Sequence, residues 1–71
     1  MPDNLSPAEV VDLERTTLIK EANDRAANRI GRATSIGAAD AARNDLKFAV
    51  KRIEALTDAQ LTEKANARRA T

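Results

Sequence analysis

The sequence predicts an all-α protein in which two long amphipathic helices fold back on each other as a hairpin, followed by a possible short third helix. Residues 5–10 and 56–61 carry the same helix-start pattern. In the first, the Ser6 hydroxyl can accept from the amide three residues on, and Glu9 can bond back to the amide of Ser6. Apolar residues then recur at helical spacing. We therefore expect residues 1–71 to form one small helical domain without strands.

The first helix is predicted to span about residues 7–31. Pro7 suits its first position, because the proline lacks only an N–H that would have no partner there. One face is apolar at helical spacing and is expected to be buried: Val11, Leu18, Ala22, Ala26, Ile30 and Ala33. The other face is polar and is expected in solvent: Asp12, Arg15, Glu21, Arg25 and Asn28.

A turn between the two long helices is predicted within residues 31–37. Gly31 and Gly37 bound this segment, and either glycine can take the left-handed conformation that ends many helices. A shallow kink is the competing interpretation, because no proline enforces a stop here.

The second helix is predicted over about residues 38–56. Its apolar positions alternate three and four apart, as in a coiled coil: Ala39, Ala42, Leu46, Ala49, Ile53 and Leu56. The alanines let a neighbouring helix approach closely but make each contact weak. The new helix start at Thr57 favours a break after Leu56 and a third helix over about 58–69, although a continuous helix is the alternative.

The composition indicates that this chain shares apolar surface with another chain. It has fourteen large apolar side chains against fifteen alanines, and no Cys or His. A core of this size rarely supplies more than about 3 to 5 kcal/mol without a disulfide, a metal or a partner. We expect an oligomeric helical bundle, or a subunit of a larger protein assembly. The expected interface residues are Val11, Leu18, Ala22, Ile30, Ala42, Leu46, Phe48, Ala49, Ile53 and Leu56.

Phe48 is the only aromatic residue and lies off the apolar seam of its helix. It points about 160 to 200° around the helix from Leu46, and Ala41 and Ala55 flank it at seven-residue intervals. Either the C-terminal helix or the N-terminal arm covers the ring, which we prefer, or the ring is a contact point for a second protein.

The charges are unevenly distributed along the chain. Residues 1–24 hold six acids and two bases, whereas residues 25–52 hold seven bases and two acids. If the hairpin forms, six cations approach the turn and could contact phosphates: Arg25, Arg29, Arg32, Arg43, Lys47 and Lys51. The alternative interpretation is that this charge distribution only reflects the helix dipole, which favours acidic residues at the start of each helix and basic residues at its end. A net charge of +1 and a single aromatic also argue against a dedicated nucleic-acid binder.

No catalytic, cofactor-binding or metal-binding residues are predicted. The glycines at 31 and 37 are one residue too far apart for a phosphate loop, and no Lys-Ser/Thr pair follows them. Without His or Cys, acid–base and nucleophilic chemistry lack their commonest groups. No run of about 18 apolar residues predicts a membrane span. We expect no membrane partner, and a cytoplasmic location or, if a phage encodes the chain, one in the virion.

These observations predict a non-enzymatic, helical interaction or structural protein. It would act through Ala-rich amphipathic helix faces, with itself or with a larger assembly as the partner. The alternative from a different class is a small nucleic-acid-binding or DNA-packaging protein that uses the basic region from Arg25 to Lys51.

Overall fold

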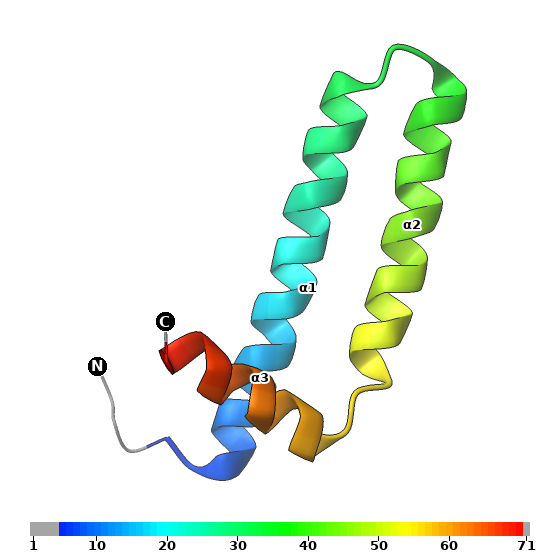
Figure 1. Cartoon of the computed structure of the whole chain (residues 1–71). Helices are drawn as coiled ribbons and strands as arrows, with labels where there is room; N and C mark the ends of the chain where they lie inside the picture. Colours follow the sequence, from blue (N-terminus) through cyan, green and yellow to red (C-terminus); the bar gives the residue numbers. More distant parts are fainter. Residues whose placement is uncertain (1–4, 71) are drawn as a thin grey trace.

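Three helices make up the fold in the computed structural model, which describes residues 5–70. They are α1 (Pro7–Arg32), α2 (Ile36–Glu54) and α3 (Asp58–Ala70), and the described residues contain no strand. α1 and α2 run antiparallel side by side, and α3 crosses the N-terminal half of α1 at the end opposite the turn (Figure 1). The molecule is elongated, measuring 46 × 24 × 16 Å. The predicted all-α hairpin is confirmed.

Both predicted helix starts form reciprocal caps. At α1, the Glu9 amide donates to Ser6 Oγ and the Ser6 amide donates to Glu9 Oε1, each at 3.3 Å. At α3, the Gln60 amide donates to Thr57 Oγ1 at 3.2 Å and the Thr57 amide donates to Gln60 Oε1 at 2.9 Å. Each cap satisfies amides that have no partner within the helix. The cap at Thr57 accounts for the break that separates α3 from α2.

The connection between α1 and α2 is shorter than the predicted turn over 31–37. α1 ends at Arg32 and α2 begins at Ile36, so Gly31 and Gly37 both lie inside helices. Neither glycine has a positive φ. The chain instead leaves α1 through Ala33 in an extended conformation, and Ser35 caps α2 by accepting from the Ala38 amide at 3.1 Å. At the end of α1 the Ala33 amide donates to the Ile30 carbonyl oxygen at 3.1 Å, so one of the last carbonyls has a partner without a left-handed glycine.

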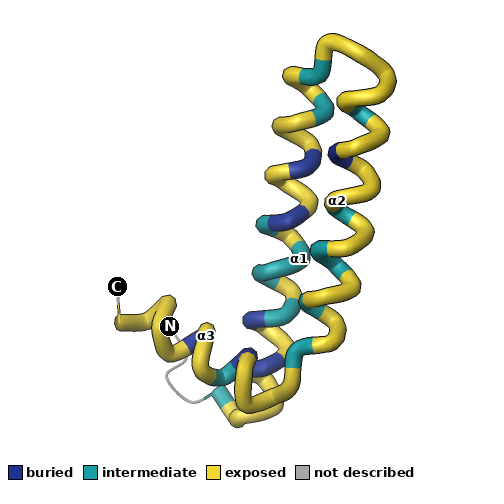
Figure 2. Tube along the Cα trace, turned by 45° about the vertical axis from the view of Figure 1, so that its right-hand side comes forward, coloured by how far each residue is buried: buried dark blue, intermediate teal, exposed yellow. Residues whose placement is uncertain are grey.

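The core consists mostly of alanine. Among residues 5–70, the buried apolar residues are Val11, Ala22, Ala26, Ala42, Leu61 and Ala65, and Leu61 is the only large side chain that is fully buried. The buried positions lie along the α1–α2 contact and where α3 crosses α1 (Figure 2). Small side chains at Ala22, Ala26 and Ala42 let the two long helices approach closely. Most of the other seam residues are only half-buried: Leu18, Ile30, Leu46, Ala49, Ile53 and Leu56.

Candidate interaction surface

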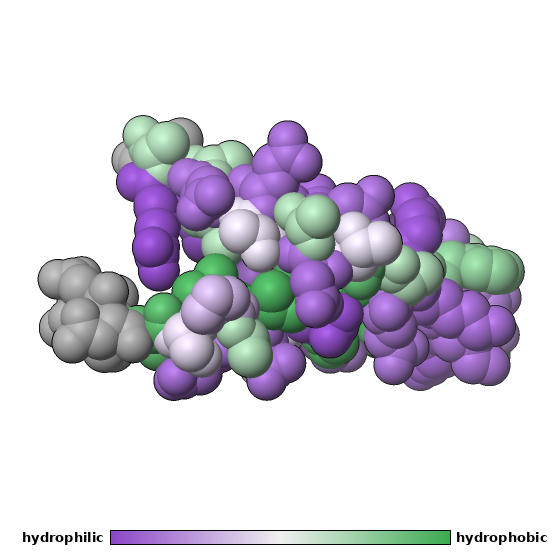
Figure 3. Space-filling view, turned by 90° about the horizontal axis from the view of Figure 1, so that it is seen from below, coloured by the Kyte–Doolittle hydropathy of each residue, from purple (hydrophilic) through white to green (hydrophobic). Residues whose placement is uncertain are grey.

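An open groove lies where the three helices meet. Its apolar floor comes from Leu18 and Ala22 of α1, Ala49 and Ile53 of α2, and Leu56, and its volume is about 360 Å³. Three cations stand around this floor: Arg25, Arg52 and Lys64. Seen from below, this end of the molecule shows a central apolar band between hydrophilic side chains (Figure 3).

The groove continues along the α1–α2 pair toward the turn. A second hollow of about 280 Å³ shares Ala22, Arg25, Ala49 and Arg52 with the first. It adds Ala26, Arg29, Ala42, Asp45 and Leu46. We call the two hollows together the three-helix groove. It gathers seven of the predicted interface residues: Leu18, Ala22, Ala42, Leu46, Ala49, Ile53 and Leu56.

The remaining predicted interface residues lie elsewhere. Val11 is buried, and Ile30 is half-buried near the turn. Phe48 is 62 % exposed. The expectation that the C-terminal helix covers this ring is wrong, because α3 packs against α1 and not against α2. The N-terminal arm, the other expected cover, falls largely on residues 1–4, outside the described residues.

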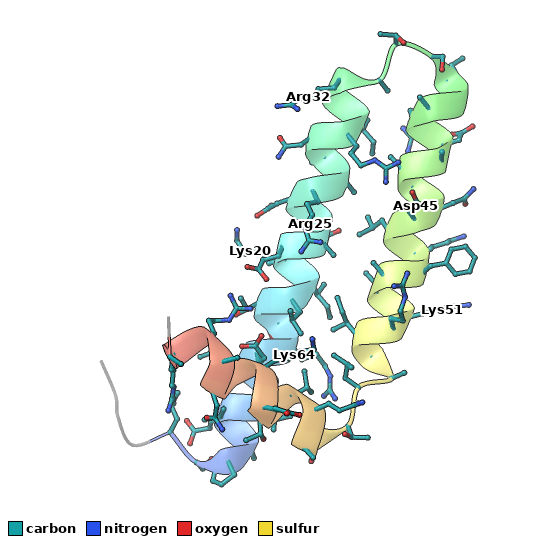
Figure 4. The ribbon with its side chains drawn as sticks, viewed as in Figure 1. Lys20, Arg25, Arg32, Asp45, Lys51 and Lys64 are labelled. Atoms are coloured by element: carbon teal, nitrogen blue, oxygen red, sulfur yellow. The ribbon has the colours of Figure 1, made fainter. Side chains whose placement is uncertain are left out.

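The six cations expected to converge near the turn do not form one cluster. Arg25 and Arg29 line the three-helix groove, whereas Arg43, Lys47 and Lys51 line a separate hollow with Leu46, Val50, Asn23 and Glu54. Arg32 points away from α2 (Figure 4). Two of the cations are already paired, since Arg29 lies 2.7 Å from Asp45 and Arg43 lies 3.0 Å from Asp40. The cations are divided because two antiparallel helices form a single layer with two faces, and the side chains along each helix are distributed over both faces.

An ion cluster that the sequence analysis missed fastens α3 to α1. Arg68 donates from Nε and Nη2 to the two oxygens of Glu14 at 3.0 and 2.8 Å, and from Nη1 and Nη2 to those of Glu21 at 3.2 Å each. Glu14 is only 3 % exposed. Hydrogen bonds to Glu14 and then to Glu21 raise the pKa of Arg68. The hydrogen bond from Arg68 lowers the pKa of Glu21.

The sequence contained one signal for this cluster. Glu14 and Glu21 are seven residues apart and therefore share a face of α1, next to its apolar stripe. Glu21 was expected on the solvent face of α1, but it is half-buried beside Arg68. A carboxylate pair on one face can hold a guanidinium through bidentate hydrogen bonds. The cluster therefore positions α3, with one guanidinium bonded to two carboxylates.

Arg15 also departs from its expected place on the solvent face. Its side chain is half-buried, and Nη2 donates to the carbonyl oxygen of Leu56 at 3.3 Å. Its Nε is buried with no hydrogen-bond partner among the described residues. Carbonyls just beyond a helix C-terminus have no partner in the helix, so a cation there is favourable. Arg15 thus ties α1 to the segment that joins α2 and α3.

Two further observations concern the described residues as a whole. They contain no group of three or more His, Cys, Asp or Glu side chains arranged to hold a metal ion. None of the three described helices has a stretch apolar and long enough to cross a bilayer. Comparisons of the chain with family models, with curated proteins and with solved structures each found no match.

Proposed function

We propose that this chain is a non-enzymatic interaction protein whose three-helix groove binds an amphipathic helix of another protein. The observation that supports this is the open apolar floor, where Leu18, Ile53 and Leu56 are only half-buried. A helix laid along the groove would remove this apolar surface from water, as helix-in-groove complexes do. The bound helix would pack with α1, α2 and α3 as a fourth member of a helical bundle.

The charges around the groove favour a partner helix with acidic residues beside its apolar face. Arg25, Arg52 and Lys64 line the floor, and none of them forms an ion pair within the described part of the chain. Two copies of the groove facing each other would bring like charges together. The groove therefore fits an acidic surface better than a second copy of itself. A cytoplasmic or virion location for such a protein stays a prediction.

Fluorescence anisotropy with two designed helical peptides tests this proposal. Both carry Leu at i, i+3, i+4 and i+7, and the positions beside the Leu face are Glu in one peptide and Lys in the other. We expect saturable binding of the Glu peptide only, weakening as salt screens the charges. Arg25→Glu or Lys64→Glu should weaken that binding. Lys47→Glu, which lies in the separate hollow, should leave it unchanged.

Equal binding of both peptides, or binding of neither, would overturn the groove proposal. Nucleic-acid binding is the second candidate, and Arg43, Lys47 and Lys51 favour it because all three line one hollow. The same assay with labelled duplex DNA and RNA tests it. An affinity that falls steeply with salt and is lost when all three are changed to Ala would support that candidate.

A further inference from the structure

α2 carries an apolar strip that its packing within the chain leaves uncovered. Ala41, Phe48 and Ala55 recur every seven residues, all three are exposed, and Phe48 is 62 % exposed. α2 packs its alanine seam against α1, and α3 does not pack against α2. An uncovered aromatic between two small residues is a favourable anchor for a second helix. We call these three residues the Phe48 strip.

We propose that the Phe48 strip is a self-association surface, on which α2 of a second copy packs antiparallel about a two-fold axis through Phe48. The symmetry of the strip supports this arrangement, because Ala41 and Ala55 are equally far from Phe48. An antiparallel two-fold axis at Phe48 sets the two phenylalanines side by side and places Ala41 of each copy opposite Ala55 of the other. Alanines at both ends let the helix axes approach closely.

The charges beside the strip are complementary under the same symmetry. Asp45 and Arg52 flank Phe48 on one side of α2, and Asn44 and Lys51 flank it on the other. Antiparallel pairing brings Asp45 of each copy to Arg52 of the other. Asp45 uses Oδ2 for Arg29 at 2.7 Å, so Oδ1 can accept from the second copy.

A parallel arrangement of the two helices fits less well. In parallel pairing, opposite flanks meet, so Arg52 of one copy would lie beside Lys51 of the other. Two cations opposed at an interface disfavour that arrangement. The charge pattern thus selects the antiparallel dimer. The Phe48 strip itself lies outside the three-helix groove, although Asp45 and Arg52 line the groove and also flank the strip. Cross-linking at Ala41 and Ala55, which do not line the groove, tests the dimer separately from peptide binding.

Disulfide trapping tests the arrangement directly, because the chain contains no cysteine. Ala41→Cys and Ala55→Cys are made as separate variants. Alone, each variant would place its two thiols about 21 Å apart along the helix axis, beyond the reach of a disulfide. Mixed in equal amounts with one variant isotopically labelled, the two should form a mixed disulfide dimer, which mass spectrometry identifies. An Ala38→Cys and Ala55→Cys mixture is the matched control, since Ala38 is exposed but off the strip.

Each outcome of the trapping experiment decides the proposal. Rapid cross-linking of the 41/55 mixture, with none in either single variant or in the control, supports the antiparallel dimer. Cross-linking of Ala41→Cys with itself overturns the register and indicates a parallel pair. Equal cross-linking of all mixtures shows random collision and also overturns the proposal.

Sedimentation equilibrium tests the role of the ring. Phe48→Ala should raise the dimer dissociation constant about tenfold or more, because a central aromatic anchor is lost. Circular dichroism of the monomer should be unchanged. Leu13→Ala is the control, since Leu13 is similarly exposed at 57 % but lies on α1. A wild-type chain that stays monomeric at every concentration, or a Phe48→Ala variant that associates as the wild type does, would overturn the proposal.

Discussion

The two ends of the hairpin are held together in different ways. At the α3 end, Leu61 is fully buried and Arg68 bonds to Glu14, a residue 54 positions away in the chain. Toward the turn, the contact between α1 and α2 depends on Ala26 and Ala42, and the ion pair between Arg29 and Asp45 is exposed. One end is therefore stabilised by a large apolar side chain and a charged cluster, the other by the close approach of small residues.

This difference means that opposite changes in side-chain volume should destabilise the two ends of the hairpin. Where a large side chain fills the contact, removing volume leaves a cavity. Where alanines allow close approach, adding volume forces the helices apart. Substitutions at both ends should separate the two kinds of contact.

Leu61→Ala should have the largest effect. We expect a loss of about 2 to 5 kcal/mol, because Leu61 is the only large side chain that is fully buried among the described residues. Urea unfolding followed by circular dichroism measures it, with helicity falling as α3 detaches. Leu13→Ala, at a position that is 57 % exposed, should change stability by no more than about 0.5 kcal/mol. Equal midpoints for the two variants would show that α3 is not packed as described.

Ala42→Leu should have the next largest effect. Ala42 is 1 % exposed between α1 and α2, so three added carbon atoms have no space, and the cost should be about 1 to 3 kcal/mol. The exposed Ala38 on the same helix gives the matched control, Ala38→Leu. Thermal melting of both variants at one concentration makes the comparison. An Ala42→Leu protein as stable as the wild type would show that the contact between α1 and α2 at Ala42 can accommodate a larger side chain.

Gly31→Ala should stabilise the protein by about 0.5 kcal/mol, since alanine loses less backbone entropy in a helix. Gly31 lies within α1 without a positive φ, and an added Cβ would meet nothing within 4 Å. A change in melting temperature measures the gain. Destabilisation would instead indicate a glycine that ends the helix in the left-handed conformation.

The smallest expected effect is a loss of folding stability at acidic pH through Glu21. Arg68 lowers the pKa of Glu21 below its usual 4.5, so the stabilisation from this contact is complete above that value. It is lost as the pH falls through the lower pKa of the folded state. Glu21→Gln should therefore lose stability less steeply than the wild type in urea titrations below pH 4.5. Identical slopes for the two proteins would show that the hydrogen bond contributes nothing to folding.

The features that were predictable from the sequence depend on residues close together in the chain. The capping pairs at Ser6 and Thr57 act over three residues, and the seam through Leu46 and Ile53 repeats every turn or two. Periodicity therefore predicted the helices and most of the groove floor. At the turn, the sequence offered Gly31 and Gly37 as helix ends, whereas Ala33 caps the end of α1 and Ser35 caps α2. Serine and glycine are both common at helix ends, so the local pattern did not fix the bounds of the connection.

The features that sequence reasoning missed depend on long-range contacts. Whether α3 covers Phe48 or crosses α1 is decided by where Leu61 and Arg68 find partners, and neither choice changes the helical period. The same contact explains why the Glu14 carboxylate can be buried, since its partner is more than fifty residues away. The six cations were expected together because their order in the sequence does not show which face of the layer each one occupies.

The docking of α3 on α1 alone has a consequence for how the molecule opens. Within the described residues, α3 packs against α1 and makes no packing contact with α2. α3 can therefore detach while α1 and α2 stay paired, so the chain holds two cooperative units. In native-state hydrogen exchange, α3 amides should exchange through this partial opening. Amides at the centre of α1 and α2 should exchange only when these two helices separate. Hydrogen exchange should therefore give two distinct opening free energies, a lower one for α3 and a higher one for the α1–α2 hairpin.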